Sequence, residues 1–108
     1  MQNFPAAIEV IQPLGSLNAS NAYDFQSQMI SQLKTPLCDG LVVDLGQVEF
    51  LDSAGLIALV SALKISRQLG KCFYLAAVSP SIRILFELTQ LDRVFEMLES
   101  HTLEPWAA

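Results

Sequence analysis

The chain alternates short apolar runs with longer segments in which apolar residues recur every three or four positions. The short runs are predicted strands, and the longer segments are predicted amphipathic helices. The strands are expected at residues 6–14, 41–45, 72–78 and 93–97, and the helices at residues 18–33, 52–69 and from 80 onward. Strands that alternate with helices in this way predict an α/β fold with helices packed on a largely parallel sheet. We expect a mostly parallel, mixed sheet of about four to five strands.

The first strand and helix are limited by turn-forming residues. Pro13 has no backbone N–H, so its strand lies at a sheet edge or ends there. Gly15 then interrupts the pattern, and Asn18 is predicted to cap the helix that follows. The apolar face of that helix consists of Ala22, Phe25, Met29, Ile30 and Leu33.

The middle of the chain has the clearest boundaries. The nearly continuous apolar run at 41–45 predicts a central strand buried on both faces, and residues 46–50 are expected to turn away from it. The second helix is predicted to begin at Asp52 or Ser53 and to end before Gly70, which favours the left-handed conformation. Its buried stripe is expected to contain Leu56, Leu59, Val60 and Leu63.

The last third repeats the strand-then-helix pattern. Ser79-Pro80 predicts a helix start, since serine caps the first turn and proline suits the first helical position. Ile82, Leu85 and Phe86 form the expected apolar face of this third helix. Residues 99–106 are expected to form a last short helix or a tail, in which Trp106 either marks a contact surface or folds back on the domain.

Length and composition predict one packed domain over residues 1–108, with a core at about 6–100 and a tail at 101–108. Of the 108 residues, 52% are apolar and 16% are charged, which is typical of a globule and not of a disordered chain. The net charge of −5 argues against nucleic-acid binding, because that binding depends on basic side chains that neutralise phosphates.

Other classes of site and location are also disfavoured. Cys38, Cys72 and His101 do not have the spacing of a metal or redox motif, so we expect no metal or cofactor and two reduced thiols. Neither a signal peptide nor an apolar run of membrane-spanning length is visible. We therefore expect a soluble cytoplasmic protein with no membrane insertion.

The segment at 42–56 carries the most information about function. It reads as a buried strand, a turn, and a helix that opens with Asp52-Ser53-Ala54-Gly55. The ends of parallel strands in α/β sheets are where sites usually form. Ser53 is expected to be exposed there, with small neighbours that leave room for another protein. A phosphate on Ser53 would be favoured by the free N–H groups of the helix start.

Segments along most of the chain resemble the STAS family, named for sulfate transporters and anti-sigma factor antagonists. The resemblance covers about residues 6–100. It rests on five segments in matching order, at residues 14–18, 41–45, 50–56, 73–88 and 91–95. The loop Phe50-Leu51-Asp52-Ser53-Ala54-Gly55-Leu56 is its most distinctive part.

The resemblance implies a bacterial binding module that has no catalytic residues and is controlled by phosphorylation of Ser53. In such proteins the unphosphorylated form binds an anti-sigma factor that is also the serine kinase, and a serine phosphatase resets the switch. The residues implied in partner binding are Gly15, Ser16, Asn18, Asp52, Ser53, Ala54, Gly55 and Leu56.

Two positions depart from the family pattern. The family often has aspartate where this chain has Asn18, which affects partner choice or the efficiency of phosphorylation. It often has a second hydroxyl residue after the acceptor, where this chain has Ala54. Ser53 is therefore the only hydroxyl residue of the loop.

Several alternatives stay open at this point. Ser53 could be an ordinary helix cap, Asp52 could cap the helix, and Asp44 is expected to accept hydrogen bonds from loop amides. The chain could instead be a STAS subunit of another assembly, such as a lipid-transport ABC complex or a signalling scaffold. A small serine-dependent enzyme is disfavoured, since His101 is the only histidine and the sequence has neither a Gly-x-Ser-x-Gly elbow nor a phosphate-binding glycine loop.

Overall fold

The structure, a computed structural model, describes residues 7–98. The predicted tail at 101–108, with His101 and Trp106, and the segment at 99–100 lie outside the described residues. The described elements are β1 (Ile8–Ile11), β2 (Gly15–Leu17), α1 (Ala22–Leu33), β3 (Gly40–Asp44), β4 (Val48–Leu51), α2 (Ser53–Leu69), β5 (Cys72–Ala76), α3 (Pro80–Leu88), the 3₁₀ turn η1 (Leu91–Arg93) and β6 (Glu96–Leu98).

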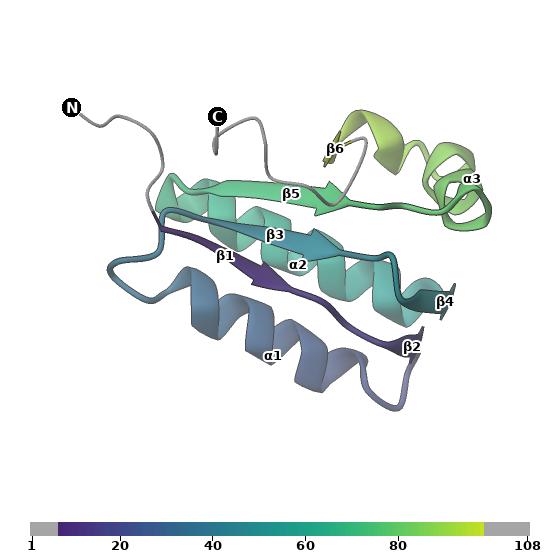
Figure 1. The fold of residues 1–108 in the computed structure, drawn as a ribbon, viewed down its shortest axis with the longest axis horizontal. Helices are drawn as coiled ribbons and strands as arrows, with labels where there is room; N and C mark the ends of the chain where they lie inside the picture. The colour runs from purple at the N-terminus through teal and green to yellow at the C-terminus, as the bar shows by residue number, and fades with distance from the viewer. Residues whose placement is uncertain (1–6, 99–108) are drawn as a thin grey trace.

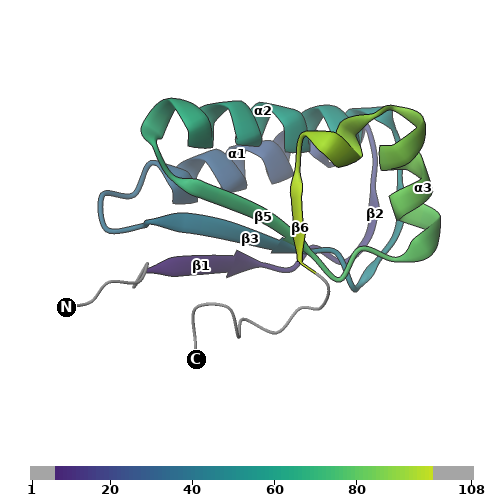
Figure 2. The same cartoon turned by 90° about the horizontal axis from the view of Figure 1, so that it is seen from above.

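Four strands form the main sheet in the order β1-β3-β5-β6, and β2 pairs with β4 in a separate two-stranded sheet. All pairings among these described strands are parallel. Helices α1 and α2 lie side by side on one face of the main sheet (Figure 1), and Figure 2 shows both of them on that same side. The predicted α/β fold with a largely parallel sheet is confirmed.

The core fills the layer between the main sheet and the two helices. Strand β3 is buried over its whole length, as expected for a central strand, and β1 is an edge strand that ends before Pro13. The largest fully buried side chains include Met29 and Leu33 from α1, Leu59 from α2, and Phe86 from α3. Phe86 meets the ring of Phe95 edge to face, with ring centroids 5.5 Å apart, which joins the C-terminal elements to this core.

Two helix starts follow the sequence pattern. Asp52 accepts a hydrogen bond from the backbone N–H of Gly55 and caps α2, and Ser79 accepts one from Ile82 and caps α3. Gly70 ends α2 in the left-handed conformation, with φ of 70°. These helix boundaries were predictable from the sequence because each depends only on residues within one helical turn.

Three expectations about local structure were wrong. Gly15 begins a strand, and the predicted turn at 46–50 contains β4. Asn18 does not cap α1: the helix begins at Ala22, and the Asn18 side chain instead accepts a hydrogen bond from the backbone N–H of Ser20 at 2.9 Å. This local turn competes with capping, as asparagine side chains often do.

The C-terminal strand also lies later than expected. The predicted strand at 93–97 is a 3₁₀ turn at Leu91–Arg93 followed by β6 at Glu96–Leu98. Cys38 and Cys72 are both free thiols, as expected. Within residues 7–98, no helix is both long enough and apolar enough to span a bilayer.

The Lys71 side chain connects the end of α1 to the start of β5. Its ammonium group donates to the backbone carbonyls of Leu33 at 2.6 Å and Thr35 at 2.9 Å. Both carbonyls lie where α1 ends, so the positive charge also suits the negative end of the helix dipole.

We expect Lys71→Met to lower the free energy of unfolding by about 1–2 kcal/mol, because hydrogen bonds from a charged donor contribute on this scale. Urea denaturation provides the measurement. Lys64→Met is the matched control, since Lys64 is exposed and should change stability by less than about 0.5 kcal/mol. Equal effects of the two substitutions would contradict the assigned role of Lys71.

Candidate functional site

The two short strands β2 and β4 build the candidate site. Ser16 aligns with Phe50 and Leu17 with Leu51 in their parallel register. Backbone hydrogen bonds join the two segments, from Gly15 N–H to the Gln47 carbonyl at 2.9 Å and from Asp52 N–H to the Leu17 carbonyl at 3.1 Å. Strand β2 and the start of α2 therefore lie side by side at one end of the molecule, although they are far apart in the sequence (Figure 1).

Ser53 is the first residue of α2 and is exposed. The Asp52 carboxylate caps the helix by accepting the Gly55 N–H at 3.1 Å, so capping does not require the Ser53 hydroxyl. Among the described residues, none hydrogen-bonds to that hydroxyl. The N–H groups of Ser53 and Ala54 belong to the first helical turn and have no acceptor within the helix. The hydroxyl is free to react, beside donors that suit a phosphate.

Gly55 does not provide room for a partner, which corrects the expectation from the sequence. It is buried, and a Cβ atom placed on it would lie 2.5 Å from Leu51 Cδ1 and 2.9 Å from the Leu17 carbonyl oxygen. Leu56 is buried as well. Both residues pack against the interior below Ser53. Neither forms part of the exposed surface.

Asn21 organises the turn that follows β2 and was not identified from the sequence. Its side-chain amide donates to the Ser16 carbonyl at 2.7 Å, and its side-chain oxygen accepts the Asn18 N–H at 3.0 Å. The polar cluster Asn18-Ala19-Ser20-Asn21 was the available signal, because Asn and Ser favour turns held by their own side chains.

Two large apolar side chains near Ser53 are exposed. Phe50 on β4 is 56% exposed, and Ile57 on α2 is 62% exposed. Ile57 follows Ser53 by four positions, which places the two residues on the same face of the helix. Neither residue stands out in the sequence, because an apolar residue in a strand or helix is usually part of the core.

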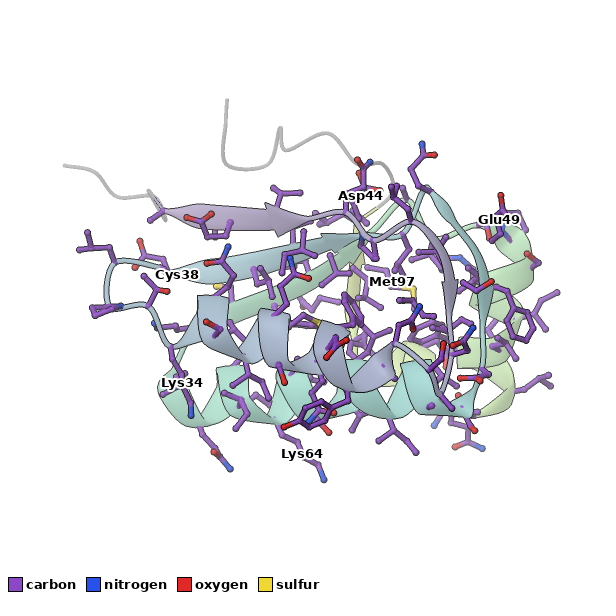
Figure 3. The ribbon with its side chains drawn as sticks, turned by 90° about the horizontal axis from the view of Figure 1, so that it is seen from below. Lys34, Cys38, Asp44, Glu49, Lys64 and Met97 are labelled. Carbon is purple, nitrogen blue, oxygen red and sulfur yellow. The ribbon has the colours of Figure 1, made fainter. Side chains whose placement is uncertain are left out.

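The segments around Ser53 carry acidic side chains. Glu49 and Asp52 belong to the segments around Ser53, and Asp24 lies in the first turn of α1. Figure 3 shows Glu49 at this end of the molecule and Lys34 at the other end. A phosphate on Ser53 would add negative charge near these carboxylates.

Asp44 has the structural role that was expected. It lies at the end of β3, is 5% exposed, and accepts a hydrogen bond from the Gly46 N–H at 2.8 Å. This contact holds the turn that leads from β3 to β4.

Comparison with known proteins identifies the fold and the family. The family model for the STAS domain matches residues 5–103. A Bordetella bronchiseptica protein classed as an anti-sigma factor antagonist, BtrV, is 27% identical over 86 residues, which cover 80% of this chain and 73% of that protein. A Thermotoga neapolitana protein of the same class is 24% identical over 93 residues, or 86% of this chain and 82% of that protein.

Solved structures agree with these matches. A Mycobacterium paratuberculosis anti-sigma factor antagonist is 27% identical, with a TM-score of 0.75 over 97% of this chain and 86% of that one. SpoIIAA matches in its unphosphorylated form (17% identity, TM-score 0.69, 89% and 82% covered) and its phosphorylated form (18%, 0.69, 89% and 84%). The STAS domain of a Vibrio cholerae SulP transporter shares the fold at 15% identity, with a TM-score of 0.71 over 92% and 78%.

The packing around Gly55 gives a test of how the site is built. Alanine normally stabilises a helix relative to glycine by about 1 kcal/mol. We expect the opposite for Gly55→Ala, a net loss of about 1–2 kcal/mol, because the added methyl group overpacks the contact with Leu17 and Leu51.

Urea denaturation of Gly55→Ala and Ser53→Ala would measure this difference. Ser53→Ala changes an exposed residue of the same helical turn and should alter stability by less than about 0.5 kcal/mol. A Gly55→Ala protein as stable as the parent would show that the contact between α2 and the two short strands is looser than described.

Proposed function

This chain belongs to the STAS domain family, and we propose that it is a regulatory protein of the anti-sigma factor antagonist type, switched by phosphorylation of Ser53. The observation that carries the proposal is the position of Ser53. Its hydroxyl is exposed, is not needed to cap the helix, and lies beside unpaired N–H groups of the first turn of α2. A residue with these properties can be modified without loss of a structural contact.

The proposed partner is an anti-sigma factor that is also a serine kinase, with a serine phosphatase to reverse the modification. The relatives named as anti-sigma factor antagonists support the first part of this assignment. The kinase and phosphatase come from the family resemblance. The reaction would occur in the cytoplasm, where such partners and ATP meet.

The proposed binding surface consists of the start of α2 and the adjacent segment at 15–18. Asp52, Ser53 and Ala54 contribute from the start of α2, and Gly15, Ser16 and Asn18 contribute from β2 and the residue that follows it. Gly55 and Leu56 support this surface from below. Phe50 and Ile57 add exposed apolar area. A partner could bury this area in addition to its polar contacts near Ser53.

The proposed switch is electrostatic and leaves the fold unchanged. A phosphate adds about −1.5 to −2 charges at neutral pH. The helix dipole offsets part of this within the domain, by roughly 0.3–1 kcal/mol at an exposed position. At a close-packed interface, an unpaired charge costs several kcal/mol to desolvate. The similarity of the chain to both forms of SpoIIAA is consistent with one fold for both states.

A second candidate is a STAS subunit of another assembly, such as a transporter complex or a signalling scaffold. The SulP transporter domain has the same fold, which supports this second candidate. Genes for a kinase and phosphatase beside this one would support the first role, and permease genes would support the second. In both cases the protein binds and regulates, and Ser53 is not a catalytic nucleophile.

We expect one phosphate on Ser53 after incubation with the cognate serine kinase and ATP, since Ser53 is the exposed hydroxyl of the loop. Peptide mass spectrometry would locate it, and Ser53→Ala should take up none. A phosphate found only at Ser79 or Ser81 would overturn the assignment of the acceptor.

We expect Ser53→Asp to bind the anti-sigma partner at least about tenfold more weakly than Ser53→Ala, which corresponds to about 1.4 kcal/mol. Titration calorimetry measures the affinities, and circular dichroism should show nearly identical folds and melting curves. Equal affinities for the two variants, repeated with enzymatically phosphorylated protein, would exclude the electrostatic switch.

A further inference from the structure

A small cavity lies at the carboxyl ends of β1, β3 and β5, where the main sheet separates from the β2–β4 pair. It has a volume of about 280 Å³ and is lined by Gln12, Asp44, Gly46, Gln47 and Ala77. Figure 3 shows Asp44 on the side of the sheet away from α1. The carboxyl ends of parallel strands are where α/β proteins commonly bind ligands.

The Asp44 carboxylate is buried in this cavity with few partners. One oxygen accepts the Gly46 N–H at 2.8 Å, and the other accepts the Gln12 side-chain amide at the long distance of 3.3 Å. Within residues 7–98, Asp44 makes no ion pair. A carboxylate has about four acceptor positions, and donors from the described residues fill two of them. A cationic donor that reached this carboxylate would add charge-assisted hydrogen bonds.

The backbone of the cavity wall is strained. Ala77 has φ of 56°, in the left-handed region that alanine rarely adopts. Such strain is concentrated at sites of function. Here it lies next to the buried carboxylate, since a Cβ atom on Gly46 would be 3.0 Å from Asp44 Oδ1 and 3.2 Å from Ala77 Cβ.

We propose that this cavity binds a small molecule with a guanidinium head group, held by Asp44. A guanidinium group is planar and can donate two parallel hydrogen bonds to a carboxylate, one to each oxygen. The side-chain oxygens of Gln12 and Gln47 are further acceptors at the cavity wall. The volume of about 280 Å³ corresponds to several water molecules at about 30 Å³ each, enough for the head group and a short chain.

A ligand in this cavity would also act on the phosphorylation site. The Gln47 carbonyl accepts the Gly15 N–H, the first hydrogen bond of the β2–β4 pair. Contact with Gln47 would therefore stabilise the pairing of β2 with β4, next to the start of α2. The binding itself does not depend on the proposed phosphorylation, so either proposal can fail alone.

The test is a titration of the full chain with N-propylguanidinium, followed by amide chemical shifts. We expect saturable shifts at Gly46, Gln47 and Ala77. N-propylurea, which has nearly the same shape and no charge, should bind at least about tenfold more weakly, because charge-assisted hydrogen bonds are roughly twice as strong as neutral ones. Shifts that do not saturate, or that spread over exposed acidic residues such as Glu9 and Glu49, would overturn the proposal.

Two variants locate the site. Asp44→Asn keeps an oxygen that can accept the Gly46 N–H but removes the charge, and it should abolish the difference between the two compounds. If Asp44→Asn does not fold, Gln47→Ala decides the question, since Gln47 is exposed and its change should spare the fold. Gln47→Ala should weaken binding while the shifts at Gly46 and Ala77 persist, and unchanged affinity in both variants would contradict the assigned site.

Discussion

The candidate site depends on the pairing of two very short strands, above all on the backbone hydrogen bond from Asp52 to the Leu17 carbonyl. This bond joins a turn near the start of the chain to the loop that opens α2. The same carbonyl lies so near Gly55 that an added Cβ atom would be 2.9 Å from it. The absence of a side chain at Gly55 therefore lets α2 begin directly against the strand pair. Without that close approach, the start of α2 would not lie against β2.

This arrangement keeps the structural tasks of the helix start apart from the residue proposed to be regulatory. Asp52 caps the helix, Gly55 and Leu56 pack beneath it, and Ser53 stays exposed with an unengaged hydroxyl. A modification of Ser53 then changes charge at the surface without removing a contact that holds the fold. The acidic surroundings of the loop and the exposed side chains of Phe50 and Ile57 are the features through which a partner would sense that change.

The parts of the fold that were predictable from the sequence depend on local signals. The boundaries of α2 followed from Asp52 and Gly70, and the buried run at 41–45 identified the central strand. Strands β2 and β4 were missed because three or four residues carry no recognisable period, and their structure comes from pairing with each other. The packing at Gly55 could not be foreseen either, because a glycine near a helix start has the same local pattern whether it faces a partner or its own core. The position of Ser53 was predictable, since it follows from the helix boundary, whereas the supporting role of Asn21 required the tertiary contacts.

The central claim is that phosphate on Ser53 changes the surface of the protein and leaves its fold intact. The most direct measurement is a comparison of backbone amide chemical shifts and hydrogen exchange between the chain with and without phosphoserine at position 53. The account predicts changes confined to the first turn of α2, to β4 and to the adjacent segment at 15–18, with β3 and β5 unaffected. Shifts and faster exchange that extend through β3 and β5 would show that phosphorylation reorganises the core, and would contradict the account.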